Sequence, residues 1–177
     1  MKTFEEVYET LPTTGWLSLE EARLLYKCCA ETNGNILEVG CYHGRSTVLL
    51  ASFGRIVYAV DPFNGFDSDD MEGVKTQIRF NQNLDERGIE NVNVIPYGIE
   101  EVPTESLEDI GLAYLDGDHT YKGTRNQINA ALEARAKVIA IHDVNDSGDG
   151  VEIKRAALEL LGPWYERVER LAVWKIK

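Results

Sequence analysis

The stretch that decides the fold is residues 35–54, NILEVGCYHGRSTVLLASFG. Its first part, 36–39, is a short and mainly apolar run of the kind found in strands covered on both faces. Gly40 and Gly44 then bracket a turn in which missing side chains let the backbone approach a ligand. From Arg45 the apolar residues follow a helical period that ends at a glycine. A strand that passes through glycines into a helix is where α/β folds hold nucleotide-like ligands.

The spacing of this turn argues against two well-known phosphate loops. A dinucleotide loop carries Gly-x-Gly-x-x-Gly, whereas Tyr42 stands here where the middle glycine belongs. Residues 44–47, GRST, are similar to the end of a P-loop, but the loop is one residue short and lacks the lysine. Glu38, just before the turn, would repel phosphates and suits a cationic ligand such as S-adenosylmethionine. The alternative is an ordinary strand–turn–helix corner without a ligand.

Length, composition and charge exclude several classes of partner. The chain has 177 residues, of which 44% are hydrophobic and 27% charged, as in globular domains. The net charge of -12 disfavours nucleic acid and anionic membrane surfaces, because binding to either requires clustered Lys and Arg. The three cysteines, Cys28, Cys29 and Cys41, lack metal-binding spacing and favour reduced thiols in a cytoplasm. We therefore expect no nucleic-acid partner and no membrane partner.

Strand and helix patterns alternate along the chain. The expected strands are 36–39, 56–61, 92–96, 111–116 and 137–143. Two capping boxes, Thr3 with Glu6 and Ser18 with Glu21, predict helices before the first strand, and 164–177 reads as a closing hairpin. We therefore predict an α/β fold: a doubly wound, mainly parallel seven-stranded sheet with an antiparallel C-terminal hairpin.

The predicted domain organisation is a single domain, 1–177. Residues 1–34 are expected to form a helical cover, and 35–177 a cofactor-binding α/β core. Within the core, a helix is expected at about 68–87. Its predicted inward-facing side chains are Met71, Val74, Ile78 and Leu84.

Candidate contacts for an adenosyl group follow the second and third strands. Asp61 ends the second strand, where an acidic side chain can accept hydrogen bonds from both ribose hydroxyls. NAD has the same ribose, so Asp61 does not separate the two ligands. After the third strand, Ile99 is expected to cover an adenine ring and Glu100 to accept from its amino group, with a turn and helix cap as the alternative. The loop at Gly15–Trp16 is expected to close over the cofactor.

Ionisable side chains gather at the edge of the predicted sheet where its strands end. They are Glu38, Asp61, Asp116, Asp118, His119, His142 and Asp143. Burying several like charges is costly unless a cation or protons offset them. Asp116 and Asp143 end neighbouring strands, and two carboxylates with waters suit Mg²⁺ or Mn²⁺. His142 as a third ligand favours a transition metal; the alternative is that these acids bind loop backbone and no metal.

Four segments together resemble a known family. They are EVGCYHGRST at 38–47, Asp61, YLDGDHTY at 114–121 and IHD at 141–143. This combination resembles class I S-adenosylmethionine-dependent methyltransferases, in the branch of small O-methyltransferases related to the macrocin and catechol types. The resemblance implies that the glycine turn holds the methionine part of the cofactor. The full set of expected cofactor contacts is Glu38, Gly40, Tyr42, Gly44, Ser46, Asp61, Ile99, Glu100 and Asp116.

The same resemblance assigns catalytic and metal-binding roles. It implies metal ligands at Asp116, His142 and Asp143, and a general base at Asp118 or His119. The branch has two acids where this chain has His142 and Asp143. The chain is also short for the branch, so the acceptor site is expected to be open or completed by the second subunit of a homodimer.

The function expected from the sequence is methyl transfer from S-adenosylmethionine to a hydroxyl oxygen of a small molecule. Assistance by Mg²⁺ or Mn²⁺ is left open. Two alternatives are an NAD-dependent oxidoreductase on the same sheet, and a protein that binds S-adenosylmethionine without catalysis.

Overall fold

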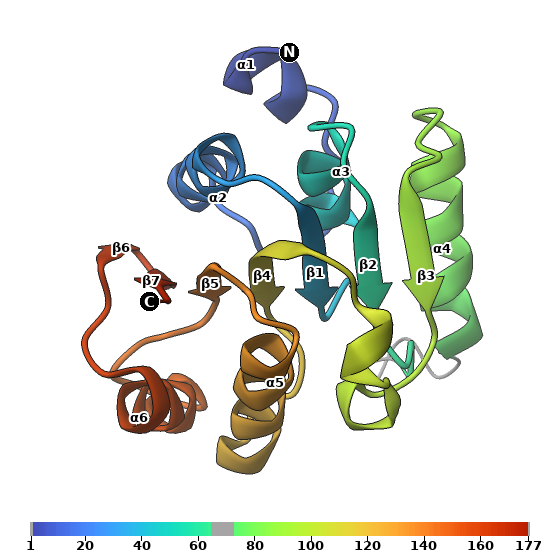
Figure 1. Cartoon of the computed structure of the whole chain (residues 1–177). Helices are drawn as coiled ribbons and strands as arrows, with labels where there is room; N and C mark the ends of the chain where they lie inside the picture. Colours follow the sequence, from blue (N-terminus) through green and yellow to red (C-terminus); the bar gives the residue numbers. More distant parts are fainter. Residues whose placement is uncertain (1, 65–72, 177) are drawn as a thin grey trace.

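One seven-stranded sheet forms the centre of the structure, a computed structural model that describes residues 2–64 and 73–176 (Figure 1). The strands are β1 (Asn35–Val39), β2 (Val57–Val60), β3 (Val92–Ile95), β4 (Ile110–Leu115), β5 (Val138–Ile141), β6 (Glu166–Val168) and β7 (Leu171–Lys175). Their order is β3-β2-β1-β4-β5-β7-β6, with β1 to β5 parallel and β7 antiparallel to both neighbours. The predicted mainly parallel sheet with an antiparallel C-terminal hairpin is confirmed.

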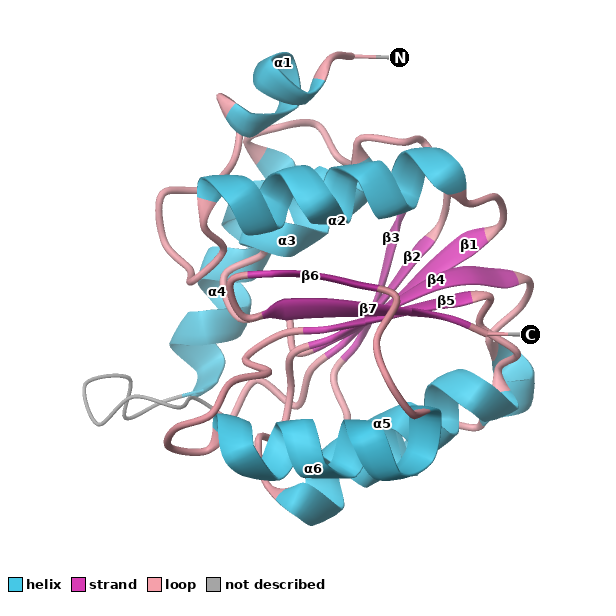
Figure 2. Ribbon diagram, turned by 90° about the vertical axis from the view of Figure 1, so that its left-hand side faces the viewer, coloured by secondary structure: helices cyan, strands magenta, loops and turns pink. Residues whose placement is uncertain are grey.

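Helices cover both faces of the sheet. The α-helices are α1 (Phe4–Tyr8), α2 (Leu19–Glu31), α3 (Arg45–Ala51), α4 (Gly73–Asp85), α5 (Tyr121–Glu133) and α6 (Gly150–Leu161). Figure 2 shows α1, α2 and α3 on one face and α5 and α6 on the other. Two apolar clusters fill these layers, one including α2, α3 and the inner side of α4, the other α5 and α6. Within the described residues, no helix is long and apolar enough to cross a membrane.

The two N-terminal helices begin at the predicted capping boxes. Thr3 caps α1 and Ser18 caps α2, and in each case the glutamate three positions later returns a hydrogen bond to the cap backbone. The capping glutamates differ in their surroundings, because Glu6 is exposed whereas Glu21 is buried. Glu21 therefore caps its own helix and is also packed inside the protein.

The predicted inner face of α4 is partly wrong. Ile78 is 49% exposed, whereas Thr76, Phe80 and Leu84 are buried at four-residue spacing. A helix that keeps Leu84 inward brings Phe80 to the same stripe, which rotates Ile78 toward solvent. The predicted start of this helix, Met71 and the side chain of Val74 lie outside the described part of the structure.

Candidate functional site

A cavity of about 610 Å³ opens at the carboxyl ends of β1, β2, β4 and β5. This edge is where open α/β sheets bind ligands, and the volume is typical of a small-molecule site. The cavity is lined mainly by residues 15–17, 40–43, Asp61, 97–100, 116–119, His142 and Asp143. The structure thus brings together most of the site residues predicted from the sequence.

The turn after β1 depends on its first glycine. Gly40 has a φ of +86°, and a Cβ built there would lie 2.2 Å from the carbonyl oxygen of Asp116. Only glycine allows the ends of β1 and β4 to approach this closely. Gly44, with φ +83°, then sets the first turn of α3. The turn therefore has a fixed shape at the mouth of the cavity.

Asp61 ties the end of β2 to this turn. Its Oδ2 accepts hydrogen bonds from the backbone nitrogens of Cys41 at 2.7 Å and Tyr42 at 2.9 Å. Its Oδ1 accepts from the backbone nitrogen of Phe63 at 2.7 Å. The side chain predicted to bind ribose thus also holds the loops around it, a role that the sequence analysis missed.

Glu38 lies beneath the turn, and it is absent from the described residues that line the cavity. The side chain is fully buried, and its Oε1 accepts a hydrogen bond of 2.5 Å from the Ser46 hydroxyl. Burial raises the pKa of Glu38 from 4.5 to about 7. Ser46 lines the cavity in the first turn of α3, so Glu38 contributes to the site by holding the Ser46 side chain in place.

Replacing Glu38 by glutamine is expected to change how stability depends on pH. In the wild type, the stability associated with protonated Glu38 is fully present below pH 4.5 and is lost as pH rises through about 7. Glutamine stays neutral, so the variant should gain roughly 3 kcal/mol relative to the wild type between pH 4.5 and pH 8. Urea unfolding of both proteins across this range measures the change, and a constant difference would refute the assignment of the shift to Glu38.

The segment before α2 forms one wall of the cavity. Arg45, the first residue of α3, donates hydrogen bonds to the carbonyl oxygens of Leu17, at 3.2 Å, and Pro12. These bonds hold the segment beside the glycine turn, where the ring of Trp16 lies 5.1 Å from that of Tyr42. Trp16 lines the cavity and is 63% exposed, so its ring offers the cavity an accessible aromatic surface.

The predicted adenine contacts lie in the wall beyond β3. Ile99 is buried, and Glu100 is exposed; both belong to a short 3-10 helix, Ile99–Glu101. Tyr97 precedes them and is 56% exposed. Together these residues offer an apolar surface with a carboxylate beside it.

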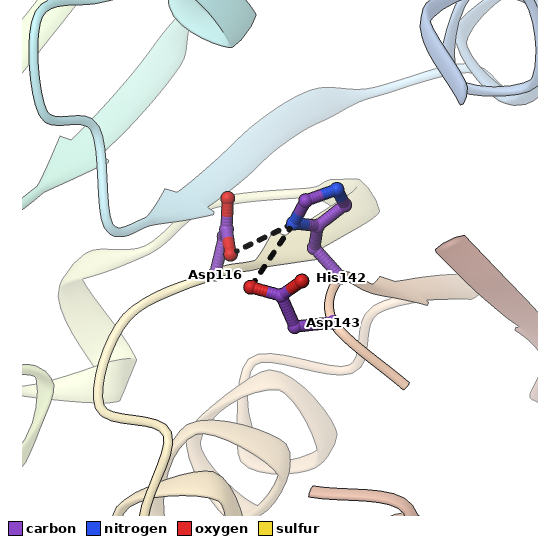
Figure 3. Close-up of side chains that lie close together, drawn as sticks. All are labelled: Asp116, His142 and Asp143. Atoms are coloured by element: carbon purple, nitrogen blue, oxygen red, sulfur yellow. Dashed lines mark hydrogen bonds and ion pairs between the residues drawn. The ribbon is translucent and has the colours of Figure 1, made fainter. Parts of the chain in front are cut away.

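Asp116, His142 and Asp143 line the cavity. Their side chains form a compact cluster (Figure 3). One donor atom from each lies within 4.8 Å of the other two. His142 Nδ1 lies 3.2 Å from Asp116 Oδ1 and 3.7 Å from Asp143 Oδ2. The expected metal ligands therefore converge from the ends of the neighbouring strands β4 and β5.

Three carboxylates, those of Glu21, Asp116 and Asp143, surround His142. Its other nitrogen, Nε2, lies 3.2 Å from Glu21 Oε2, so carboxylates flank the ring on both sides. Burial lowers the pKa of His142, but these carboxylates outweigh burial and raise it to about 12. A cation bound at Nδ1 would have to replace the proton there. Burial raises the pKa of Asp116, but His142 and His119 outweigh burial and lower it well below the ordinary value.

The two candidate bases have different surroundings. Asp118 is exposed, and its Oδ1 accepts a hydrogen bond of 2.8 Å from the Thr120 backbone at the start of α5. His119 Nε2 lies 3.5 Å from Asp116 Oδ1 and 3.8 Å from Asp143 Oδ2. The hydrogen bond to Asp116 raises the pKa of His119. Asp118 therefore serves a turn, whereas His119 faces the cluster.

The sequence analysis missed two residues of the site. Glu21 was recognised only as a helix cap, although its carboxylate faces His142. Arg170, in the turn between β6 and β7, places a guanidinium nitrogen 2.9 Å from Asp143 Oδ1. The capping box explains Glu21 as a helix cap, and no sequence pattern marks Arg170. Nothing local to either residue indicates that the start of α2 and the turn between β6 and β7 meet at the site.

The fold is Rossmann-like, and a family model identifies the class of protein. Residues 37–144 match a family model described as a methyltransferase domain. The match spans more than half of the chain, and the chain belongs to this methyltransferase family. The resemblance noted in the sequence is thereby confirmed. No curated protein sequence matches the chain.

Solved structures of low sequence identity share the fold. CalS11, a TDP-rhamnose 3'-O-methyltransferase of calicheamicin biosynthesis, is 16% identical, with a TM-score of 0.67 over 97% of this chain and 90% of CalS11. PaMTH1 from Podospora anserina, solved with S-adenosylhomocysteine, is 15% identical, with a TM-score of 0.69 over 98% of this chain and 88% of its own. The O-methyltransferase NovP is 15% identical, with a TM-score of 0.68 over 98% and 88%.

Proposed function

We propose that this methyltransferase moves the methyl group of S-adenosylmethionine to a hydroxyl oxygen of a small molecule. The observation that carries the proposal is the cavity, in which the glycine turn and Asp61 share one space with His119 and the acidic cluster. Two structural relatives described as O-methyltransferases support the type of acceptor, and a third, a methyltransferase solved with S-adenosylhomocysteine, supports the donor.

The donor would lie along the carboxyl edge of β1 and β2. Asp61 already accepts three backbone hydrogen bonds, two at Oδ2 and one at Oδ1, so one acceptor site, on Oδ1, remains for a ribose hydroxyl. Ile99 and Glu100 would contact the adenine. The methionine part would lie against the turn, with Gly40, Tyr42, Ser46 and Asp116 around it and Glu38 supporting Ser46 from below. Gly44, predicted as a cofactor contact, is absent from the described residues that line the cavity, and it would act by setting the first turn of α3.

His119 is the base that the geometry favours. When bound, S-adenosylmethionine supplies an electrophilic methyl group on a sulfonium. Transfer of that methyl group to the acceptor oxygen would release S-adenosylhomocysteine, and His119 would take the hydroxyl proton. Asp116 holds the imidazole at 3.5 Å and is itself fixed by the Tyr114 hydroxyl at 3.1 Å. Orientation of this kind contributes much of the rate in a displacement.

A divalent cation fits the cluster beside His119. Two carboxylate oxygens and one imidazole nitrogen converge there, a donor set found in protein sites for divalent metals. Asp116, His142 and Asp143 would hold the ion. When bound, it would lower the pKa of an acceptor hydroxyl.

We propose a small-molecule acceptor, a homodimer and a cytoplasmic location. The cavity volume suits a small-molecule acceptor. Trp16 lines the cavity and is exposed, and the second subunit of a homodimer would cover it. The three cysteines form no disulfide, which supports the proposal of a reducing compartment such as the cytoplasm.

Binding of the donor is expected to raise the melting temperature. At about 100 times its dissociation constant, a ligand of the folded state adds roughly 2.7 kcal/mol, or roughly 5–10 °C for a chain of this length. Differential scanning fluorimetry with S-adenosylmethionine, S-adenosylhomocysteine and NAD⁺ measures this shift. A shift with NAD⁺ alone would favour the oxidoreductase alternative, and donor binding without turnover over a broad acceptor panel would favour a binding protein.

A further inference from the structure

Glu21 is a buried carboxylate that the reaction steps above do not use. Its side chain is 1% exposed, although it belongs to the first turn of α2, where glutamates are usually solvated. Its Oε2 accepts a hydrogen bond of 3.0 Å from the Ser18 backbone, and its Oε1 accepts one of 3.1 Å from the Arg170 backbone. Backbone groups from two distant segments therefore fix both oxygens.

The fixed carboxylate determines how His142 is presented. Glu21 Oε2 lies 3.2 Å from Nε2, the nitrogen on the far side of the ring from the cavity cluster. Nδ1 is thereby directed between Asp116 and Asp143, as Figure 3 shows. The ring itself is 1% exposed, which leaves little room for another orientation. A histidine that binds a metal through one nitrogen commonly directs the other at a carboxylate, and here Nε2 and Glu21 are in ion-pair contact.

We propose that Glu21 is a positioning residue that holds His142 as a nitrogen ligand, so that the cluster takes a transition-metal ion such as Mn²⁺ in preference to Mg²⁺. The inference deepens the proposed function and rests on it only in assigning the ion to methyl transfer. Three separate segments build the arrangement: the start of α2, the residue after β5 and the turn between β6 and β7.

The donor set supports this choice of metal. Mg²⁺ prefers oxygen ligands and retains several waters, whereas an imidazole nitrogen favours divalent transition metals. Mn²⁺ is the weakest binder of that series and serves here as its paramagnetic probe. A third carboxylate is present within reach of the site, but Glu21 stands behind His142 and is bound to two backbone groups. The cluster therefore offers an imidazole nitrogen, from His142, as its third donor in place of a third carboxylate oxygen.

A double-mutant cycle on metal affinity tests the proposal without an activity assay. Free Mn²⁺ is measured by electron paramagnetic resonance during titration of the wild type, Glu21→Gln, His142→Ala and the double variant, with Mg²⁺ as competitor. Glu21→Gln is expected to weaken Mn²⁺ binding by roughly 10–100-fold in the wild-type background and to have no further effect in the His142→Ala background. Mg²⁺ is expected to compete only at much higher concentration than Mn²⁺.

Glu6→Gln is the matched control. Glu6 occupies the same capping-box position in α1, where its carboxylate accepts from the Thr3 backbone at 2.7 Å in an exposed setting. Its replacement removes an equivalent cap and is expected to leave Mn²⁺ affinity unchanged. Thermal unfolding without metal shows whether each variant folds.

Several results would overturn the proposal. Glu21→Gln could leave the affinity unchanged or reduce it equally in both backgrounds, or Mg²⁺ could compete as well as Mn²⁺. If Glu21→Gln fails to fold, the electron spin echo of the Mn²⁺-loaded wild type decides, because a directly bound imidazole nitrogen modulates the echo; no modulation would refute the proposal. A metal-free titration with S-adenosylhomocysteine reports separately on the proposed function.

Discussion

Replacing Gly40 by alanine should destabilise the protein by roughly 4 kcal/mol and abolish binding of the methyl donor. The new Cβ would lie 2.2 Å from the Asp116 carbonyl oxygen and 2.4 Å from its carbonyl carbon, at a φ of +86°. Because these neighbours are backbone atoms of an adjacent chain segment, the ends of β1 and β4 would have to move apart. Urea unfolding and titration with S-adenosylhomocysteine measure the two effects.

Gly54→Ala is the control for the backbone conformation alone. Gly54 also has a positive φ, +69°, but within the described part of the chain a Cβ there would meet no atom within 4 Å. The expected cost is roughly 1–2 kcal/mol, the strain of a left-handed residue. Equal losses in the two variants would show that the contact with Asp116 does not constrain the turn.

Replacing His119 by glutamine should lower kcat by roughly 10²- to 10⁴-fold, the usual contribution of a positioned general base. Glutamine keeps a polar group near Asp116 but cannot accept a proton at neutral pH. Since His119 acts on the acceptor proton and is not one of the predicted cofactor contacts, the loss is expected in kcat, with little change in the affinity for S-adenosylhomocysteine. Steady-state kinetics with an identified acceptor, together with calorimetry, measure both quantities.

Asp118→Asn separates the two candidate bases. Asparagine keeps an oxygen that can accept from the Thr120 backbone, so the turn before α5 should persist. The expected loss in kcat is less than about 10-fold, below the usual contribution of a general base. A larger loss for Asp118→Asn than for His119→Gln would assign the base to Asp118 instead.

The sequence predicted the sheet because its signals are local and repeated. Each strand shows a short apolar run, the helices follow at their own period, and the capping boxes at Ser18 and Thr3 mark helix starts directly. The inner face of α4 was harder, since Thr76 is polar in sequence yet buried, and Ile78 is apolar yet exposed. Packing of a whole helix, rather than the hydrophobicity of single residues, decides such positions.

The site was predictable only where it follows strand ends. Asp116 and Asp143 end neighbouring parallel strands, so their meeting could be anticipated. The contact between Glu21 and His142 could not be anticipated, because the capping box accounts for a glutamate at position 21 without any distant contact. The approach of α2 to His142 depends on tertiary packing. Glu38 shows the opposite case, since a strand-end position predicted a cavity contact and the side chain points beneath the turn toward Ser46.

The central claim is that S-adenosylmethionine binds along the carboxyl edge of the sheet, between the glycine turn and Asp61. A crystal structure with S-adenosylhomocysteine tests it most directly. We expect ligand density in the cavity with the ribose hydroxyls against Asp61, the adenine against Ile99 and the methionine part at Gly40. Density for the ligand at another place, or a cavity filled by the protein's own side chains, would contradict the account.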